Sequence, residues 1–413
     1  MERSGRVPLL VVGGGIGGLA TALAAARAGL AAHVLERSPE FGELGAGLQL
    51  APNALRVLDH LGLLEEISRS AVCPRRLVLG DLRTGEEITA LDVDDAFRAR
   101  YGYGYLVMHR GDLLDVLLAA CRATGRVTLE TGREVETVED AGDGGAVVRC
   151  AGGAVYACEA VVGADGLRSA VRQAIVGDGE PVVSPFVAYR GPMDAAAAPR
   201  HRCFEDMVIW AGPDRHFVQY LIHHGGLYNQ VAVFKSDRFG SDGWGGVEEL
   251  DERFQEACAP VQEGRRHLWR DRRWPLVDRP PVGGWTRGRV TLLGDAAHCM
   301  HQYLAQGACQ ALEDAVCLAD RLSRHDDPGA AFLDYERVRR PRTALLQSTA
   351  RRFGDVLHAD GLAAELRDAL LAHRRPDDCT YVDWLYAYDV RQAEPAVAGL
   401  PPLTARPPGP GRA

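Results

Sequence analysis

The feature that most constrains this chain is a run of glycines at residues 13–18, directly after a short apolar segment. Residues 7–12 are almost continuously apolar, as expected for a strand that is buried on both faces of a sheet. Gly13, Gly15 and Gly18 occupy the fixed positions of the pattern G-x-G-x-x-G, and an Ala- and Leu-rich helix is predicted to follow. Glycines there let a pyrophosphate approach the backbone N–H groups at the helix N-terminus. The order of strand, glycine turn and helix therefore predicts a dinucleotide-binding unit.

An acidic residue ends the next predicted strand. The helix is expected to cover residues 16–28 and to end at Gly29, and residues 31–35 form a second strand that leads into Glu36. A carboxylate roughly 20 residues after the glycine turn is suited to bind both hydroxyls of a ribose. We assign Glu36 and the adjacent Arg37 to the nucleotide site.

Two later segments also place an aspartate after a buried strand and a glycine. Asp165 lies in the segment 161–169, and Gly294 and Asp295 lie in the segment 292–298. Either segment alone is equally well explained as an ordinary turn. Carboxylates at such turns can also accept hydrogen bonds from ribose or ribityl hydroxyls.

Taken together and in this order, the three segments resemble those of the class A aromatic hydroxylases, which are single-component flavoprotein monooxygenases. The resemblance extends from about residue 7 to residue 390. It implies an α/β (α+β) fold: a Rossmann-like FAD-binding domain with an inserted antiparallel β-sheet substrate domain, followed by C-terminal helices. It also implies FAD as the cofactor, NADH or NADPH as the reductant and O2 as the oxidant. The chain has no second dinucleotide fingerprint, which agrees with transient docking of the nicotinamide in this family.

The nucleotide-binding unit is expected to be discontinuous, because a β-rich region interrupts its segments. The predicted boundaries are residues 1–75, 102–180 and 282–350 for the FAD-binding domain, 76–101 and 181–281 for the substrate domain, 351–400 for a C-terminal helical segment and 401–413 for a disordered tail.

The resemblance assigns residues to the cofactors one by one. His109-Arg110 matches the family's arginine near the FAD pyrophosphate, and the segment 45–53 matches one that lies near the isoalloxazine. The full set expected to bind FAD is Gly13, Gly15, Gly18, Glu36, Arg37, Gly47, Gln49, Arg110, Asp165, Gly294, Asp295, Gln306, Gly307 and Ala308. Residues linked to NAD(P)H are Asp165, Arg168 and Arg190, the last of which is otherwise explained as part of an interface ion pair.

Within the family the chain resembles the 3-hydroxybenzoate 6-hydroxylases more closely, in the segments 269–275, 302–308 and 383–386. This implies para-hydroxylation of 3-hydroxybenzoate to gentisate, or the same reaction on a related hydroxybenzoate or phenol. Those enzymes place a His and a Tyr four residues apart on the substrate-facing sheet, and His216 and Tyr220 have that spacing. On a strand both face the same side. With Gln302, which matches a substrate-binding Gln, they are the predicted catalytic residues.

The chemistry of the reaction gives His216 a role that does not depend on the resemblance. A flavin C4a-hydroperoxide is an electrophile and reacts best with an electron-rich phenolate. A phenol with a pKa near 10 reaches that form at pH 7 only at a cost of about 4 kcal/mol. An imidazole can take the proton at the ring. The alternative is that His216 is a structural histidine, and that Tyr220 is an ordinary core tyrosine.

The chain departs from the family pattern at Cys299-Met300-His301, where a proline is usual close to the flavin. Cys299 removes a rigid φ angle, so we expect a looser loop. His301 is expected either to act as a second acid or base or to point outward. The departure leaves the reaction class in place and the identity of the substrate open.

Composition excludes several other classes of protein. The formal charge of −9 disfavours nucleic acid and anionic membranes as partners. Ten scattered cysteines without a CxxC pair favour a reducing cytoplasm over a disulfide or metal site. The N-terminal residues lack the pattern of a signal peptide, and no stretch of about 20 apolar residues predicts a membrane span. A homodimer is compatible with these features.

Four other functions remain as alternatives. Two are a salicylate-type decarboxylating hydroxylase and a hydroxylase that tailors natural products, both with the same fold. A flavin halogenase needs a catalytic lysine, and the single lysine, Lys235, lies outside any such motif. A non-enzymatic FAD-binding redox module is the alternative of a different class.

Overall fold

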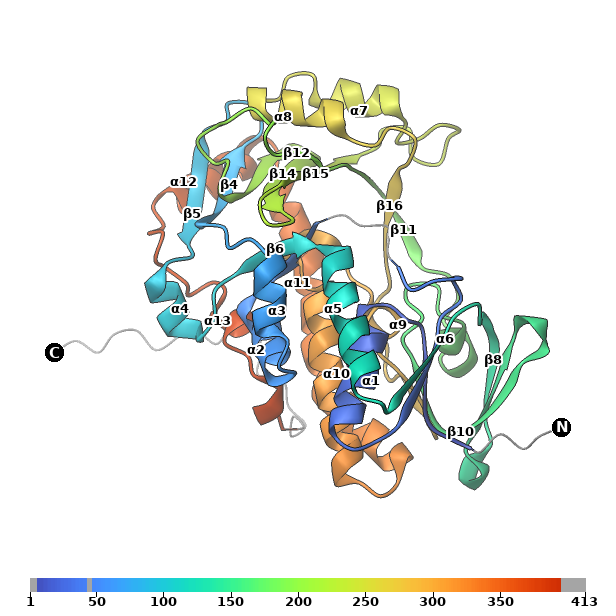
Figure 1. Cartoon of the computed structure of the whole chain (residues 1–413). Coiled ribbons are helices and arrows are strands. Elements are labelled where there is room, and N and C mark those ends of the chain that lie inside the picture. Colours follow the sequence, from blue (N-terminus) through green and yellow to red (C-terminus); the bar gives the residue numbers. More distant parts are fainter. Residues whose placement is uncertain (1–5, 43–46, 395–413) are drawn as a thin grey trace.

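The computed structural model describes residues 6–42 and 47–394 and contains two large β-sheets with helices packed against them (Figure 1). Residues 45 and 46 of the segment assigned to the isoalloxazine lie outside the described residues, as does the tail 401–413. The two sheets belong to different regions of the sequence, and their facing sides enclose the candidate site.

The first sheet has a parallel centre in the order β18-β10-β1-β2-β7. These strands are β1 (Val7–Val12), β2 (Ala32–Leu35), β7 (Val127–Glu130), β10 (Val155–Gly163) and β18 (Val290–Leu292). Antiparallel strands extend it, namely β8 (Val135–Asp140), β9 (Ala146–Cys150) and β17 (Thr286–Arg287). The carboxyl ends of β1, β10 and β18 adjoin, so the three glycine-bearing turns predicted from the sequence meet at one edge.

Helices cover the first sheet and supply most of its core. Helix α1 (Ile16–Arg27) packs against α5 (Arg110–Ala123) and α10 (Gly307–Arg324), and α10 packs against α11 (Pro328–Leu357). The apolar residues of these helices and strands form one continuous core cluster. Figure 1 shows α1, α5 and α10 side by side in the lower half of the molecule.

The second sheet has the order β16-β11-β15-β14-β13-β4-β5, with β12 paired to β15. Its strands are β4 (Arg76–Asp81), β5 (Glu87–Asp92), β11 (Val182–Arg190), β12 (Met193–Asp194), β13 (Met207–Gly212), β14 (Arg215–Ile222), β15 (Leu227–Lys235) and β16 (Trp274–Asp278). All pairs are antiparallel, as expected, except β4 with β13. The two strands of that pair come from separate stretches of the sequence, so no hairpin turn requires them to be antiparallel.

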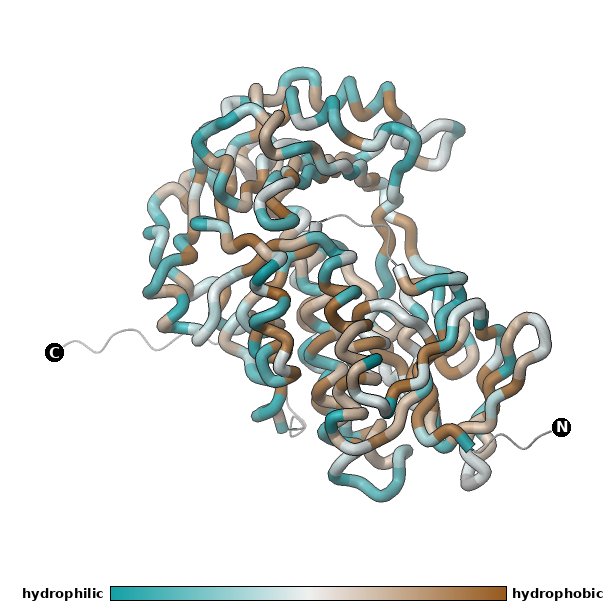
Figure 2. Tube along the Cα trace, viewed as in Figure 1, coloured by the Kyte–Doolittle hydropathy of each residue, from teal (hydrophilic) through white to brown (hydrophobic). Residues whose placement is uncertain are grey.

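Two helices that the sequence did not indicate cover the outer face of this sheet. They are α7 (Val247–Phe254) and α8 (Ala259–Gly264), and their apolar residues pack on the outward side chains of the strands. Figure 2 shows hydrophilic and hydrophobic residues alternating along both helices, which is typical of helices with one buried face. The inner face of the sheet is thereby turned toward the FAD-binding region.

The remaining elements connect the two sheets. They are β3 (Gly47–Leu50), β6 (Leu106–His109), α2 (Pro52–His60), α3 (Leu64–Ser70), α4 (Asp95–Tyr101), α6 (Ala170–Ile175), α9 (Asp295–His298), α12 (Gly361–Ala372) and α13 (Asp383–Tyr386). Within the described residues, the C-terminal segment expected to be helical at 351–400 contains the end of α11, α12 and α13. Within residues 6–42 and 47–394, none of the helices combines the length and hydrophobicity that crossing a bilayer requires.

Candidate active site

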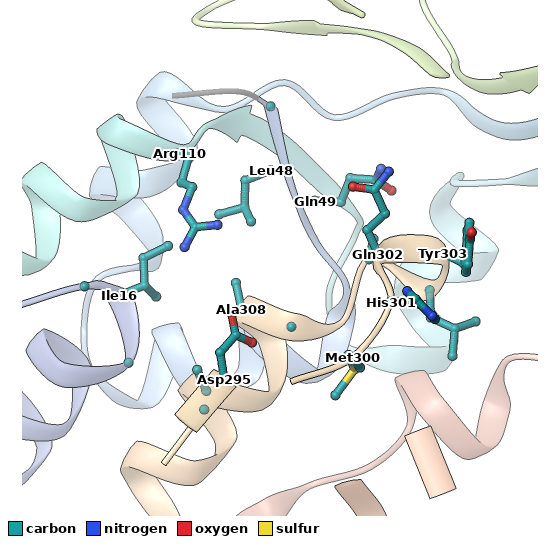
Figure 3. A pocket seen from close by; sticks show the side chains of 18 of the residues that line it. Ile16, Leu48, Gln49, Arg110, Asp295, Met300, His301, Gln302, Tyr303 and Ala308 are labelled. Atoms are coloured by element: carbon teal, nitrogen blue, oxygen red, sulfur yellow. The ribbon is translucent and has the colours of Figure 1, made fainter. Parts of the chain in front are cut away.

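A cavity of about 990 Å³ opens between the two sheets. Its walls come from the turns after β1, β10 and β18, from the inner face of the second sheet, and from α11 to α13. Figure 3 shows Arg110 and Asp295 toward one end of it, and Gln302, His301 and Tyr303 toward the other. The volume is at the upper end of the range of about 300–1,000 Å³ that is common for small-molecule and cofactor sites.

The first glycine turn presents bare backbone to this cavity. Gly13 has a φ of 108°, and a Cβ atom there would lie 2.4 Å from the carbonyl oxygen of Ala164. Gly15 precedes α1 and lines the cavity. Gly18 does not line the cavity. A Cβ atom at Gly18 would lie 1.9 Å from the carbonyl oxygen of Gly13, so this glycine serves the close packing of α1 on the turn. A helix N-terminus approached in this way fits the pyrophosphate of FAD.

Glu36 lines the same end of the cavity, and both of its oxygens are held by backbone groups. Oε2 accepts a hydrogen bond of 2.8 Å from the N–H of Gly14, and Oε1 accepts one of 2.9 Å from the N–H of Ser38. These bonds orient the carboxylate, which retains lone pairs for a ribose diol. Arg37 also lines the cavity.

The two predicted aspartates differ in their surroundings. Asp165 accepts hydrogen bonds from the hydroxyl of Ser169 and the N–H of Val171, so its carboxylate holds the start of α6, and burial raises its pKa. Both aspartates line the cavity, and Asp295 lies on the side of it where Arg110 is found (Figure 3). Burial lowers the pKa of Arg110, and the nearby carboxylate of Asp295 opposes that shift. Arg110 and Asp295 are thus placed for the polar backbone of a dinucleotide.

The predicted segment 306–308 is divided in its roles. Gly307 and Ala308, at the start of α10, line the cavity, as does Gly294 after β18. The side chain of Gln306 is instead buried in a polar network, where its Oε1 accepts hydrogen bonds of 3.0 Å from Asn53 and from Gln310. The side chain of Gln306 is therefore not placed to contact the cofactor, and only its backbone could do so.

The inner face of the second sheet brings the predicted substrate residues into the cavity. His216, Val218 and Tyr220 alternate along β14 and all three line the cavity, whereas Phe217 packs under the outer helices. His216 is only 3% exposed. Burial, together with the neighbouring His358, holds the pKa of His216 well below its usual range. The imidazole is therefore neutral at physiological pH and able to accept a proton.

Tyr220 belongs to a polar group that connects the sheet with β3. Burial raises its pKa well above the usual value, so Tyr220 is a hydrogen-bond donor at neutral pH. Gln49 interacts with Tyr220 and accepts a hydrogen bond of 2.7 Å from the hydroxyl of Tyr105. Gly47 leaves room for this group, since a Cβ atom there would lie 2.4 Å from the hydroxyl of Tyr220. The N–H of Gly47 also donates to Oδ1 of Asn229 at 2.9 Å.

Arg190 and Gln302 line the cavity and contact each other. Nη2 of Arg190 donates a hydrogen bond of 2.9 Å to Oε1 of Gln302. The alternative that Arg190 forms an interface ion pair finds no partner in the part of the chain that the structure describes: its Nε is buried without a hydrogen bond, and the ring of Trp274 faces the guanidinium. Arg168 lines the cavity at the other, nucleotide end.

The loop that departs from the family pattern keeps the geometry of a proline-containing one. Cys299 has φ −47° and ψ 134°, close to the values that a proline imposes, so the expected loosening is not seen in the backbone. Its thiol does not line the cavity. His301 does, and its Nε2 lies 3.4 Å from Oδ2 of Asp278. His301 therefore points inward and not outward. Burial lowers its pKa, so the side chain is neutral.

Several lining or supporting residues were not identified from the sequence. Tyr303 and Tyr105 line the cavity, and His358 lies directly behind His216. Tyr303 directly follows Gln302, so its place beside a predicted substrate residue is a sequence signal that indicates it. His358 has no local signal, because its partner is 142 residues away in the chain.

Comparisons with known proteins agree with this geometry. A family model described as FAD binding domain matches residues 6–200 and 242–349. The chain is 41% identical over 392 residues to 3-hydroxybenzoate 6-hydroxylase 1 of Aquipseudomonas alcaligenes, covering 92% of this chain and 97% of that protein. It is 39% identical to 3-hydroxybenzoate 6-hydroxylase of Polaromonas naphthalenivorans (strain CJ2), with 93% and 96% covered.

Solved structures show the same fold. HpxO of Klebsiella pneumoniae complexed with FAD and uric acid superposes with a TM-score of 0.80 at 25% identity, covering 94% of this chain and 97% of that one. The cavity walls described above have the donors and the close backbone approaches that FAD requires. The chain belongs to the family of FAD-dependent aromatic monooxygenases that includes the 3-hydroxybenzoate 6-hydroxylases.

Proposed function

We propose that the protein hydroxylates 3-hydroxybenzoate at ring position 6, which is para to the phenolic hydroxyl, and releases gentisate. The position of His216 supports this most directly: a buried, neutral imidazole lies in the cavity wall on the same strand face as Tyr220. The names of the relatives that are 38–41% identical support the choice of substrate.

The residues that would hold FAD are the first glycine turn, Glu36, Arg110, Asp295 and the start of α10. The chemistry that FAD supplies when bound is activation of O2, after reduction by NADH or NADPH. Asp165 and Arg168 are proposed to serve the nicotinamide nucleotide, although Asp165 already holds the start of α6. Arg190, which the sequence also linked to that nucleotide, is proposed to serve the substrate instead, because it is hydrogen-bonded to Gln302. The side chains of the protein supply binding, proton transfer and exclusion of water.

His216 acts on the phenol of the substrate. Nε2 is the ring nitrogen that His358 does not engage, and it accepts the phenolic proton as the ring carbon para to the oxygen becomes electron-rich. Tyr220 donates a hydrogen bond that orients the same ring. Positioned acid–base groups of this kind contribute about 10²–10⁴-fold to a rate.

Arg190 and Gln302 are proposed to bind the carboxylate of the substrate, which is meta to the phenolic hydroxyl. A guanidinium and an amide N–H group match a carboxylate in charge and geometry. Apolar side chains of the second sheet, among them Val218 and Val231, cover the ring. Excluding water there keeps the activated oxygen from being lost as H2O2.

The experiment is a substrate panel with the purified, FAD-loaded enzyme, scored by NADH and NADPH consumption and by product identity in mass spectrometry. The panel contains 3-hydroxybenzoate, salicylate, 3-amino-4-hydroxybenzoate and 3-methoxybenzoate. Gentisate from 3-hydroxybenzoate is the expected product. Catechol from salicylate as the main product would replace this proposal with a decarboxylating hydroxylase.

A cytoplasmic location and a homodimeric assembly are part of the proposal. All ten cysteines are free thiols, nine of them buried, which suits a reducing compartment. Light scattering of the purified enzyme measures the assembly, and a monomer at working concentration would remove the dimer from the proposal.

A further inference from the structure

His216 has a second histidine as its hydrogen-bond partner. Nδ1 of His216 lies 2.8 Å from Nε2 of His358, and the two rings stack with their centroids 5.0 Å apart. The contact requires that one of these nitrogens carries a proton and the other a lone pair. The pair therefore connects the cavity, through two imidazoles in series, with the end of α11.

The second ring lies on the side of the first that faces away from the cavity. His216 lines the cavity and His358 does not. His358 directly follows α11 and is 8% exposed, compared with 3% for His216. Aromatic side chains enclose the pair: Phe186 stacks on His358 at 4.6 Å, and Tyr303 packs edge-on against both rings, at 5.7 and 5.4 Å. The pair is thus shielded from bulk water along its sides.

Charged groups near His358 come from three different elements. They are Asp214 in the turn before β14, Lys235 at the end of β15 and Arg367 on α12. Burial lowers the pKa of His358 to about 4, which Asp214 opposes and Arg367 and Lys235 reinforce. A ring that is neutral at rest can accept a proton from its neighbour. The carbonyl end of α11 favours the positive charge that passes through it.

We propose that His216 and His358 act in series to carry the phenolic proton of the substrate to solvent, an inference that rests on the proposed function. The phenol O–H bond breaks, and its proton bonds to Nε2 of His216. The proton on Nδ1 of His216 passes to Nε2 of His358, and the proton on Nδ1 of His358 passes to water. The phenolate keeps the electron pair, one proton appears in solvent, and both rings are neutral again.

The same path returns the proton at the end of the reaction. The product hydroxyl groups must be protonated before release, and transfer in the reverse direction restores the starting tautomers. His358 touches neither substrate nor cofactor position, so it is a positioning and relay residue behind the catalytic His216.

The test is stopped-flow mixing of the FAD-loaded enzyme with 3-hydroxybenzoate in weakly buffered solution that contains a pH indicator. Phenolate absorbance and indicator colour are followed in the wild type, His358→Gln and His358→Phe. In the wild type the two signals rise together. Since general acid–base catalysis contributes about 10²–10⁴-fold, both signals slow by at least about tenfold in the variants. In a third variant, His358→Ala, added imidazole restores the rate of both signals.

Binding of 3-methoxybenzoate, which has no phenolic proton, separates a relay from a merely structural role. Its affinity is unchanged in the His358 variants if the residue relays protons. His325→Gln, which removes a histidine bonded to Asp334 between α10 and α11, is the matched control and leaves both signals unchanged.

Two results overturn the relay. One is proton release at the wild-type rate in His358→Gln and His358→Phe. The other is an equal loss of binding affinity for 3-hydroxybenzoate and for 3-methoxybenzoate in these variants. A wild type that hydroxylates 3-hydroxybenzoate but releases no proton on binding also overturns the relay and leaves the proposed function intact. A wild type that neither binds nor hydroxylates any phenol of the panel overturns both.

Discussion

Nη2 of Arg190 donates a hydrogen bond to Oε1 of Gln302 across the cavity wall, at 2.9 Å, and thereby ties β11 to the turn ahead of α10. Nε of the same guanidinium is buried without a hydrogen-bond partner in the described part of the chain. Burial lowers the pKa of Arg190, with Tyr220 opposing and Arg110 adding to the shift, but an arginine remains charged. A charged group with a free donor at this place is suited to an anionic ligand.

Arg190→Gln is expected to raise KM for 3-hydroxybenzoate by about 10- to 100-fold, because hydrogen bonds to charged groups contribute about 1.5–3 kcal/mol. Steady-state kinetics measure the effect, and 3-methylphenol, which lacks the carboxylate, should be insensitive to it. Arg272→Gln is the control, since Arg272 faces the same Trp274 ring at 6.0 Å but is exposed. A rise in KM for NADH alone would assign Arg190 to the reductant instead.

Gly13→Ala is expected to abolish retention of FAD. The new Cβ atom would lie 2.4 Å from the Ala164 carbonyl oxygen at a φ of 108°, so the turn must open where the pyrophosphate binds. Gly29→Ala is the matched control: its φ is 90°, but no atom lies within 4 Å of the new Cβ. Both variants carry backbone strain of about 1–2 kcal/mol. Flavin absorbance per mole of purified protein distinguishes them, and equal flavin content would contradict the assignment of the turn.

Asp314 on α10 forms buried ion pairs with His298 and with Arg339 on α11, and these pairs should make the folded protein less stable in acid. Burial raises the pKa of Asp314, but His298 and Arg339 more than offset this, and the pKa falls to about 2. An unfolded aspartate has a pKa near 3.9, so the unfolded chain takes up the proton first. The stabilisation, about 2–3 kcal/mol, is therefore complete above pH ~4 and is lost as the pH falls toward ~2.

Urea unfolding at pH 5, 4 and 3 measures this loss. Asp314→Asn should be less stable at pH 5 and should show a flatter dependence on pH below 4. The exposed pair Asp377 and Arg375 supplies the control, because Asp377→Asn removes an ion pair of similar geometry that solvent screens. An unchanged slope in Asp314→Asn would contradict the argument.

Patterns local in sequence predicted the parts of the site that local backbone geometry determines. The glycine turn follows from residues 7–18, and the shared orientation of His216 and Tyr220 follows from the period of a strand. Contacts between segments that are distant in the sequence could not be predicted from such local patterns. His358 meets His216 only because α11 ends beside β14, and the parallel pairing of β4 with β13 depends on where the chain re-enters the sheet. The conformation of Cys299 was likewise set by its surroundings, not by its residue type.

Gly354→Ala provides a test of how closely α11 supports the active site. An alanine inside an exposed helix is usually more stable than glycine, by about 1 kcal/mol. Here, however, the new Cβ atom would lie 2.6 Å from Cε2 of Tyr303, whose ring also packs against His216 and His358. We expect the ring to be displaced, the melting temperature to fall and kcat to drop while FAD is retained. Gly283→Ala, with no atom within 4 Å of its Cβ position and no left-handed φ angle, is the control for the effect of an added methyl group. A Gly354→Ala enzyme with a raised melting temperature and unchanged kcat would show that Tyr303 can move without consequence for the histidine pair.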